Sequence, residues 1–292
     1  MQQLAFWTQR EHVVNVASVP QRSPFRYPGG KTWLVPYIRQ WLVSKREAPT
    51  LLIEPFAGGG IVSLTVAAER LARHVLMVER DEAVAAVWQT IIHDKGGGEW
   101  LAERITAFKV SSDSVTAFLA TPASCPREQA FQTIVKNRVN RGGIMAPGAG
   151  LIKEGENGKG LSSRWYPQTL KRRILDIVQI RDRLEFTQSD GLTSFTQYAA
   201  DSKAVFFIDP PYTVAGKRAG SRLYKYSEVN HEELFRLSSK LVGDFLMTYD
   251  DEVEVRDLAK RYGFEVRTVA MKSTHHVAMN ELLIGRNLQW LR

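Results

Sequence analysis

The tetrapeptide Asp209-Pro210-Pro211-Tyr212 follows the apolar run 204–208, and its residue types suit the binding of a planar amine. A short, β-rich apolar run predicts a buried strand of an α/β sheet, and ligands of such sheets bind where the strands end. The two prolines remove two N–H donors, so the Asp209 carboxylate and the Pro210 carbonyl are left as acceptors. With the flat face of Tyr212, they fit a group that bears an NH2, such as the edge of a base turned out of its helix. A proline turn that only caps the strand is the alternative interpretation.

A second set of residues predicts a nucleoside-binding site. Residues 54–60 place a glycine-rich turn between a predicted strand, 51–53, and a predicted helix, 61–71. Glycines let backbone N–H groups approach a ligand closely. Glu79 ends the next predicted strand, where an acid commonly binds the hydroxyls of a ribose. The loop has neither the spaced glycines of dinucleotide-binding enzymes nor a Walker lysine, so it favours a nucleoside-bearing cofactor without a pyrophosphate.

The elements that must position these residues alternate between strand and helix, which predicts an α/β fold. The alternation stops near residue 95 and resumes near 184, and seven glycines between Gly142 and Gly160 exclude a packed helix there. The sequence therefore predicts a sheet domain that carries one insert. The expected parts are an N-terminal arm, 1–23, a sheet domain made of 24–94 and 185–292, and an insert, 95–184.

The composition excludes several classes of protein. With 44% hydrophobic and 24% charged residues among 292, the chain is typical of a soluble globular protein. It shows no membrane-spanning apolar stretch and no signal peptide, which favours a cytoplasmic protein. A single cysteine, Cys125, and six scattered histidines give no disulfide framework and no zinc spacing, so no metal is expected.

The positive charge is concentrated in the insert. The chain has a net charge of +8, and residues 121–183 hold twelve Lys or Arg against five acids. A second basic run contains Lys217, Arg218, Arg222 and Lys225. Charge gathered beside a base pocket favours a polyanionic partner, most simply a nucleic acid. A solvated basic surface is the alternative.

Three motifs resemble those of the Dam-type (D12 class) adenine-N6 DNA methyltransferases. They are Pro-Phe-Arg-Tyr-Pro-Gly-Gly-Lys at 24–31, Glu-Pro-Phe-Ala-Gly-Gly-Gly at 54–60 and Asp-Pro-Pro-Tyr at 209–212, in the order of that family. The resemblance implies a Rossmann-like sheet that binds S-adenosyl-L-methionine, with target recognition in the insert. It further implies a monomer or weak dimer that methylates N6 of a flipped adenine in double-stranded DNA.

The resemblance also implies roles for single residues. Expected cofactor contacts are Tyr27, Lys31, Phe56, Gly58, Glu79, Asp190 and Asp209, and the expected catalytic residues are Asp209, Pro210 and Tyr212. Near the expected recognition hairpin, the sequence offers Arg138, Asn140 and Arg141 for DNA binding, and the second basic run offers Lys217, Arg218 and Arg222. The hairpin differs from that of the best-known members, so their target sequence does not carry over.

Three other functions stay open at this point. An RNA adenine methyltransferase and a cytosine-N4 methyltransferase use related chemistry, although cytosine-N4 relatives usually carry Ser where this chain has Asp209. A non-catalytic DNA-binding protein on the same fold is the third. The cytosine-C5 mechanism is disfavoured, because Cys125 lies in no pocket motif.

Overall fold

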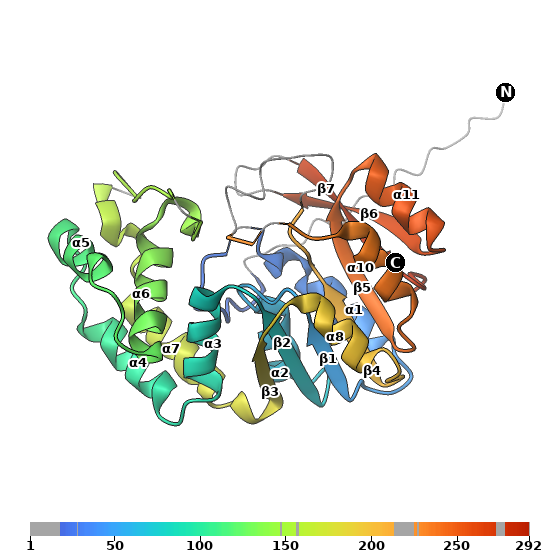
Figure 1. Ribbon diagram of the computed structural model, residues 1–292, viewed down its shortest axis with the longest axis horizontal. Helices are drawn as coiled ribbons and strands as arrows, with labels where there is room; N and C mark the ends of the chain where they lie inside the picture. Colours follow the sequence, from blue (N-terminus) through green and yellow to red (C-terminus); the bar gives the residue numbers. More distant parts are fainter. Residues whose placement is uncertain are drawn as a thin grey trace.

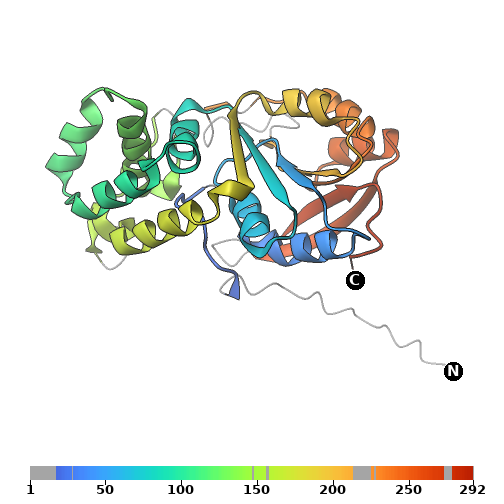
Figure 2. The same cartoon turned by 90° about the horizontal axis from the view of Figure 1, so that it is seen from below.

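The computed structural model describes residues 18–27, 29–146, 148–155, 158–212, 225–226, 228–272 and 278–291. A seven-stranded sheet with helices on both faces confirms the expected α/β class (Figure 1 and Figure 2). The strands are β1 (Leu51–Glu54), β2 (His74–Glu79), β3 (Leu184–Gln188), β4 (Ala204–Ile208), β5 (Asp244–Asp250), β6 (Glu265–Lys272) and β7 (Ala278–Gly285).

The strand order places the ends of β1 and β4 side by side. The order is β3-β2-β1-β4-β5-β7-β6, with β1 to β5 parallel and β7 antiparallel to both of its neighbours. The chain runs outward from β1 in one direction and from β4 in the other, so the order reverses between these two strands. Ligands of open α/β sheets bind in the crevice at such a reversal.

The sheet is covered on both faces because successive residues of a strand point to opposite sides. In β1, Leu52 joins the apolar cluster under one set of helices and Ile53 joins the cluster under the other set. The first set is α1 (Val35–Val43), α2 (Ile61–Glu69) and α3 (Glu82–Ile92), and the second is α8 (Gly191–Tyr198), α10 (His231–Ser239) and α11 (Val253–Arg261). Strands of a sheet that is buried on both faces have continuous apolar sequences, and β4 is an example.

The insert is mostly helical and packs on α3. Its helices are α4 (Gly97–Ala107), α5 (Ser112–Ala120), α6 (Pro126–Val139) and α7 (Pro167–Val178), with short 3₁₀ helices η3 (Arg141–Gly143), η5 (Gly160–Arg164) and η6 (Arg181–Arg183). Figure 1 shows these helices to one side of the sheet, beyond α3. Buried Phe131 and Ile174 belong to the same apolar cluster as Trp88 of α3. The insert therefore shares a continuous core with the sheet domain.

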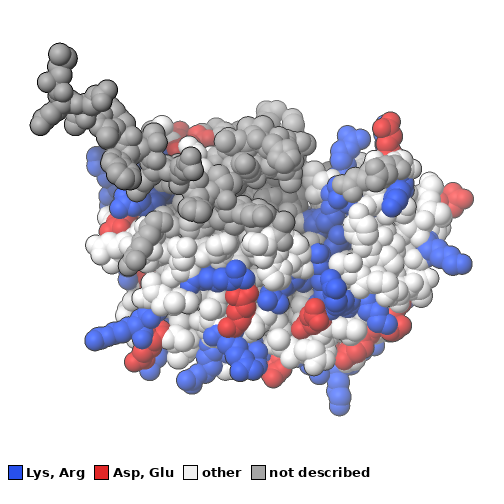
Figure 3. Space-filling view, turned by 180° about the vertical axis from the view of Figure 1, so that it is seen from behind, with Lys and Arg blue, Asp and Glu red and all other residues white. Residues whose placement is uncertain are grey.

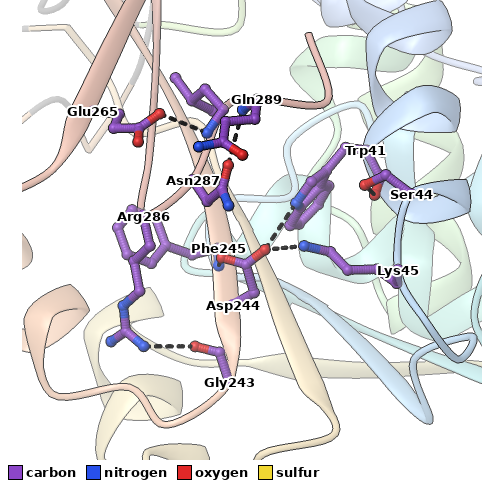
Figure 4. A network of polar contacts seen from close by, with 11 residues as sticks. Trp41, Ser44, Lys45, Gly243, Asp244, Phe245, Glu265, Arg286, Asn287 and Gln289 are labelled. Carbon is purple, nitrogen blue, oxygen red and sulfur yellow. Dashed lines mark hydrogen bonds and ion pairs between the residues drawn. The ribbon is translucent and has the colours of Figure 1, made fainter.

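The start of β5 is fixed to α1 by a polar network (Figure 4). The buried indole of Trp41 donates to the Asp244 carboxylate at 3.2 Å, and Lys45 forms an ion pair with the same group. Arg286, which directly follows the neighbouring strand β7, donates to the carbonyl of Gly243 at 3.4 Å. This network lies at the amino end of β5, the opposite end of the strand from Asp250.

Some expectations are corrected or fall outside the described residues. The helix expected at 61–71 is shorter, because α2 ends at Glu69, where Arg70 adopts a left-handed conformation with φ 56°. Before α1, the chain forms a 3₁₀ turn, η2 (Lys31–Leu34). Of the expected arm, residues 1–17 lie outside the described residues, and Val19 is buried in the core. No helix of the described residues is long and apolar enough to span a membrane.

Candidate functional site

A cavity of about 1390 Å³ lies at the carboxyl ends of the parallel strands. The segments after β1, β2, β3 and β4 all reach it, and so do the end of β5 and parts of the insert. Its walls contain every residue that the resemblance implies for cofactor binding and catalysis: Tyr27, Lys31, Phe56, Gly58, Glu79, Asp190, Asp209, Pro210 and Tyr212. These residues come from five separate segments, which the fold brings to one edge of the sheet.

The glycine loop after β1 is shaped by an aromatic ring. The ring of Tyr27 lies against Gly58 and Gly59, and a Cβ atom at either glycine would come within 2.6 Å or 2.9 Å of it. Gly58 has φ 46°, a conformation that side chains other than hydrogen rarely adopt. The Gly58 carbonyl accepts the indole N–H of Trp88 at 2.9 Å. The loop therefore tolerates only glycine at these positions.

Glu79 holds the glycine loop from the next strand. Its Oε2 accepts the Gly58 N–H at 2.8 Å, and its Oε1 accepts the N–H groups of Arg80 and Asp81, each at 2.8 Å. Burial raises the pKa of Glu79, and these N–H donors oppose the rise. Both carboxylate oxygens are thus engaged by the backbone, and Oε2, which accepts a single N–H, retains a lone pair for a hydroxyl group.

Asp190 and Phe56 complete the part of the cavity nearest β3. Asp190 caps α8, because its Oδ1 accepts the Leu192 N–H at 2.9 Å, and its other oxygen lies 3.5 Å from Arg80. Gly191 follows it in close contact with the loop after β1, since a Cβ atom there would meet the Pro55 carbonyl oxygen at 2.2 Å. The cap and this contact fix Asp190 beside the ring of Phe56.

Asp209 is anchored through a single oxygen. Its Oδ1 accepts the Tyr212 hydroxyl at 2.8 Å and the Thr248 hydroxyl at 2.9 Å, and it lies 3.0 Å from the Lys31 ammonium. No hydrogen bond to Oδ2 is found among the described residues. The carboxylate is therefore held rigidly, with one oxygen left for a donor in the cavity.

Tyr212 is stacked against a second tyrosine. Its ring lies 5.4 Å from that of Tyr249, with the planes 22° apart, and the Lys31 ammonium lies 4.9 Å from its centroid. Burial and the nearby Asp209 raise the pKa of Tyr212, so its hydroxyl stays protonated and can donate. The aromatic face that the sequence predicts is thus in place beside Asp209.

Two residues expected to contact DNA are buried instead. Arg138 is 4% exposed, and it donates to the Pro24 carbonyl. Asn140 is 2% exposed and donates to the Ile144 carbonyl at 2.7 Å. The structure does not support a DNA contact by either residue, because both side chains are buried and donate to backbone carbonyls. Their neighbour Asn137 does the same, since it donates to the carbonyls of Arg26 and Gly143.

The other residues expected to bind DNA line the cavity or lie outside the described part of the chain. Arg141 lines the cavity as expected, and Arg164 and Arg173 join it there. Among the described residues, every acid that lines the cavity comes from the sheet domain, whereas the insert contributes these arginines. Figure 3 shows Lys and Arg side chains gathered between the insert and the sheet domain, on the face of the molecule drawn in that view. Lys217, Arg218 and Arg222 lie outside the described residues.

Three residues of the site are not among those expected from the sequence. Thr248 bonds to Asp209, Tyr249 stacks on Tyr212, and Glu281 lies 3.5 Å from Lys31. Thr248 and Tyr249 end a predicted strand, so their position at the carboxyl edge was readable in outline. Glu281 carried no such signal, because β7 runs antiparallel and brings its early residues to that edge.

No cluster of three or more His, Cys, Asp or Glu side chains that could hold a metal is found in the described part of the chain. The acid-lined end of the cavity instead suits an organic cation. S-adenosylmethionine has a positively charged sulfonium and an ammonium group. The glycine loop, Glu79 and the neighbouring carboxylates therefore fit this cofactor.

Among solved structures, 52 chains match. A transferase from Pyrococcus horikoshii is 12% identical, with a TM-score of 0.33, and the match covers 86% of this chain and 62% of that one. The rRNA methyltransferase aviRa from Streptomyces viridochromogenes is 13% identical, with a TM-score of 0.41 and coverage of 88% and 85%. Precorrin-6y C5,15-methyltransferase from Geobacter metallireducens is 8% identical, with a TM-score of 0.36 and coverage of 85% and 84%.

No curated protein matches this chain by sequence. The model of one family does, and it matches residues 27–116, from the Tyr27 motif through the glycine loop and Glu79 into the insert. The third motif, at 209–212, lies outside that range. The cofactor expected from the sequence, S-adenosyl-L-methionine, is the methyl donor of this family and is confirmed at that level. The chain is thus a methyltransferase by its family match, which is to the D12 class N6 adenine-specific DNA methyltransferases.

Proposed function

We propose that this enzyme transfers a methyl group from S-adenosylmethionine to N6 of an adenine turned out of double-stranded DNA. The observation that carries the proposal is the state of Asp209. Three donors hold its Oδ1, no hydrogen bond to Oδ2 is found among the described residues, and Asp209 lines the cavity together with Pro210 and Tyr212. An exocyclic amine has two hydrogens to give, and the Asp209 carboxylate and the Pro210 carbonyl can take one each.

The cofactor supplies an electrophilic methyl group. Adenine N6 is a weak nucleophile because its lone pair is delocalised into the ring, so orientation and electrostatic support decide the rate. Asp209 and the Pro210 carbonyl turn the lone pair of N6 toward the methyl group, and the Tyr212 ring carries the base. The rigid anchoring of Asp209 by Lys31 and Thr248 gives this orientation at little further entropic cost.

The charge of the cavity supports a nucleic acid as the substrate. Arg26, Arg141, Arg164 and Arg173 line its basic end, whereas Asp209 lies among the acids of the sheet domain. A nucleotide has the same polarity, because its phosphate is anionic and the edge of its base can donate. The domain division also belongs to this proposal: residues 24–94 and 185–292 catalyse, and residues 95–184 recognise the target.

The test is methyl transfer from labelled S-adenosylmethionine to double-stranded DNA that lacks adenine methylation. We expect N6-methyladenine in the digested product, and we expect Asp209→Ala to lower the rate by roughly 10² to 10³, the usual effect of removing one transition-state contact. Cofactor affinity should fall by much less than the rate, since Asp209→Ala removes one expected cofactor contact and leaves the glycine loop and Glu79 intact.

Two controls separate this proposal from its alternatives. RNA of the same sequence should accept no methyl group, and the digest should contain no N4-methylcytosine. A normal rate for Asp209→Ala, or transfer to RNA or cytosine alone, would contradict the proposal. Asp190→Ala, tested beside it, should weaken cofactor binding and leave the methylated position in DNA unchanged.

A further inference from the structure

Glu281 is a buried carboxylate in the cavity that none of the three motifs contains. It lies on β7, opposite Asp250 of β5 and Val269 of β6, and it is 4% exposed. Because β7 is antiparallel to β5, the first half of β7 lies at the carboxyl ends of the parallel strands. Glu281 thus reaches the same cavity as Asp209.

The Lys31 ammonium lies between two carboxylates. It is 3.0 Å from Asp209 Oδ1 and 3.5 Å from Glu281 Oε1, and it donates to the Gly29 carbonyl at 3.1 Å. The side chains of Lys31 and Glu281 are only 5% and 6% exposed, so water screens this arrangement little. One positive charge is therefore shared between the carboxylate that would meet the base and a second one behind the lysine.

The second oxygen of Glu281 has no hydrogen-bond partner among the described residues, although it is buried. A buried carboxylate oxygen without a partner destabilises the fold, and an apolar side chain would avoid that cost. Stability alone therefore gives no reason for a carboxylate at this position. Its effect on the neighbouring charges does.

The charges around Glu281 allow it to change its own ionisation near neutrality. Burial raises the pKa of Glu281 to about 7, Lys31 opposes the rise, and Asp209 and Asp250 add to it. Tyr212 is a further titratable neighbour among the described residues, and the charges of Asp209 and Glu281 both help to keep its hydroxyl protonated. Glu281 is thus ionised on the alkaline side of neutrality and protonated on the acidic side.

We propose that Glu281 is a positioning residue that acts through Lys31, taking part of the ammonium charge so that Asp209 keeps its negative charge for the substrate amine. The inference rests on the proposed function, because it assigns Asp209 to that amine. When Glu281 is neutral, the whole Lys31 charge falls on Asp209. The carboxylate then attracts the N6 hydrogens less and supports methyl transfer less.

The first test is the pH dependence of the single-turnover methylation rate. In the natural protein, the rate should rise with pH through about 7 as Glu281 ionises. Glu281→Gln should lose this rise and have a rate roughly tenfold lower above it, which corresponds to one pKa unit of electrostatic support. Its affinities for cofactor and DNA should not change. Glu265→Gln is the charge-matched control, because Glu265 lies at the far end of β6 and accepts the Leu288 N–H.

A double-mutant cycle shows whether the effect passes through Lys31. If it does, adding Glu281→Gln to Lys31→Gln should cause no further loss of rate. Additive losses would overturn the proposal, and so would a Glu281→Gln enzyme that keeps the rise near neutrality. Glu281→Asp should retain a rise of this kind, since it retains the carboxylate.

A second measurement does not depend on activity. In the cofactor-free protein with ¹³C-labelled glutamate, one carboxyl signal should titrate near pH 7 and vanish in Glu281→Gln. In Lys31→Gln that signal should titrate at higher pH, because the ammonium that favours the ionised form is gone. An unchanged titration in Lys31→Gln would contradict the coupling. This result is independent of whether DNA is the substrate, so failure of the proposed function is recognised separately by the absence of methyl transfer to DNA.

Discussion

Glu54 is a buried carboxyl group at the end of β1, at the first residue of the glycine-loop motif. It is 4% exposed, and its Oε2 accepts the Ser63 N–H at 3.0 Å and also the Ser63 hydroxyl. Burial raises the pKa of Glu54 to about 8, and the bonds from Ser63 oppose the rise. The protonated group can still accept both bonds, so it joins β1 to α2 without a buried charge.

The raised pKa predicts that stability depends on pH. Because the folded protein binds this proton more tightly than the unfolded chain, its contribution is full below the usual carboxyl pKa near 4.5 and is lost as pH rises through about 8. The loss is about 1.4 kcal/mol per unit of pKa difference. Glu54→Gln should flatten the fall in free energy of unfolding between pH 5 and 8.5, measured by urea unfolding. The exposed Glu185→Gln should not, and equal curves for all three proteins would contradict the assignment.

At the scale of elements, α1 and β5 are joined at the edge of the sheet away from the cavity. The indole N–H of Trp41 is buried, and the Asp244 carboxylate accepts it at 3.2 Å while pairing with Lys45 (Figure 4). A buried donor that loses its acceptor costs about 1–3 kcal/mol, whereas an exposed ion pair is worth about 0–1 kcal/mol.

This difference gives an ordering of variants. Asp244→Ala should lower the free energy of unfolding by about 1–3 kcal/mol, and Lys45→Ala should lower it by less than about 1 kcal/mol. Denaturant unfolding of both variants measures the two values. Methyl transfer below the unfolding transition should be normal for both, because the network is remote from Asp209. A Lys45→Ala loss as large as that of Asp244→Ala would show that the ion pair, rather than the indole bond, joins the two elements.

At the scale of the whole molecule, the cavity joins two parts of opposite charge. Arg173 of α7 lines it and donates to the Ser23 carbonyl at 3.0 Å, whereas the preceding Arg172 is exposed and does not line it. The two residues have the same charge, but only the side chain of Arg173 lines the cavity. They therefore form a natural pair for testing where DNA lies.

Under the proposed function, Arg173→Ala should weaken binding to double-stranded DNA and reduce the slope of log K against log salt by about 0.9, the value for one phosphate contact. Arg172→Ala should change both quantities less. Fluorescence anisotropy at several salt concentrations measures them, and thermal unfolding checks that the loss of the Ser23 contact has not unfolded the protein. Equal effects of the two variants would place the DNA away from the cavity.

The sequence predicted the part of the site that depends on parallel strands. Glu79 and Asp209 come at the ends of apolar runs, Asp190 follows the alternating residues of β3, and the carboxyl ends of parallel strands meet at one edge, so their convergence could be expected. Glu281 could not be placed, because strand direction is invisible in a single apolar run. The burial of Arg138 and Asn140 could not be predicted, because the sequence of a basic, polar segment does not show whether its side chains contact solvent or backbone carbonyls. Here the two side chains donate to the carbonyls of Pro24 and Ile144.

The position of Glu281 after all three motifs in the sequence sets the order in which the ribosome completes the site. Lys31 and Asp209 are both synthesised before Glu281, so a nascent chain that has just passed residue 272 holds all three sequence motifs without the carboxylate behind the lysine. At that stage β6 cannot pair with the sheet, because in the finished protein β7 lies between β5 and β6. A protein shortened before residue 278 would therefore still contain all three sequence motifs. It would nevertheless expose the edge of β5, and Asp209 would be the one carboxylate of this pair left beside the Lys31 ammonium.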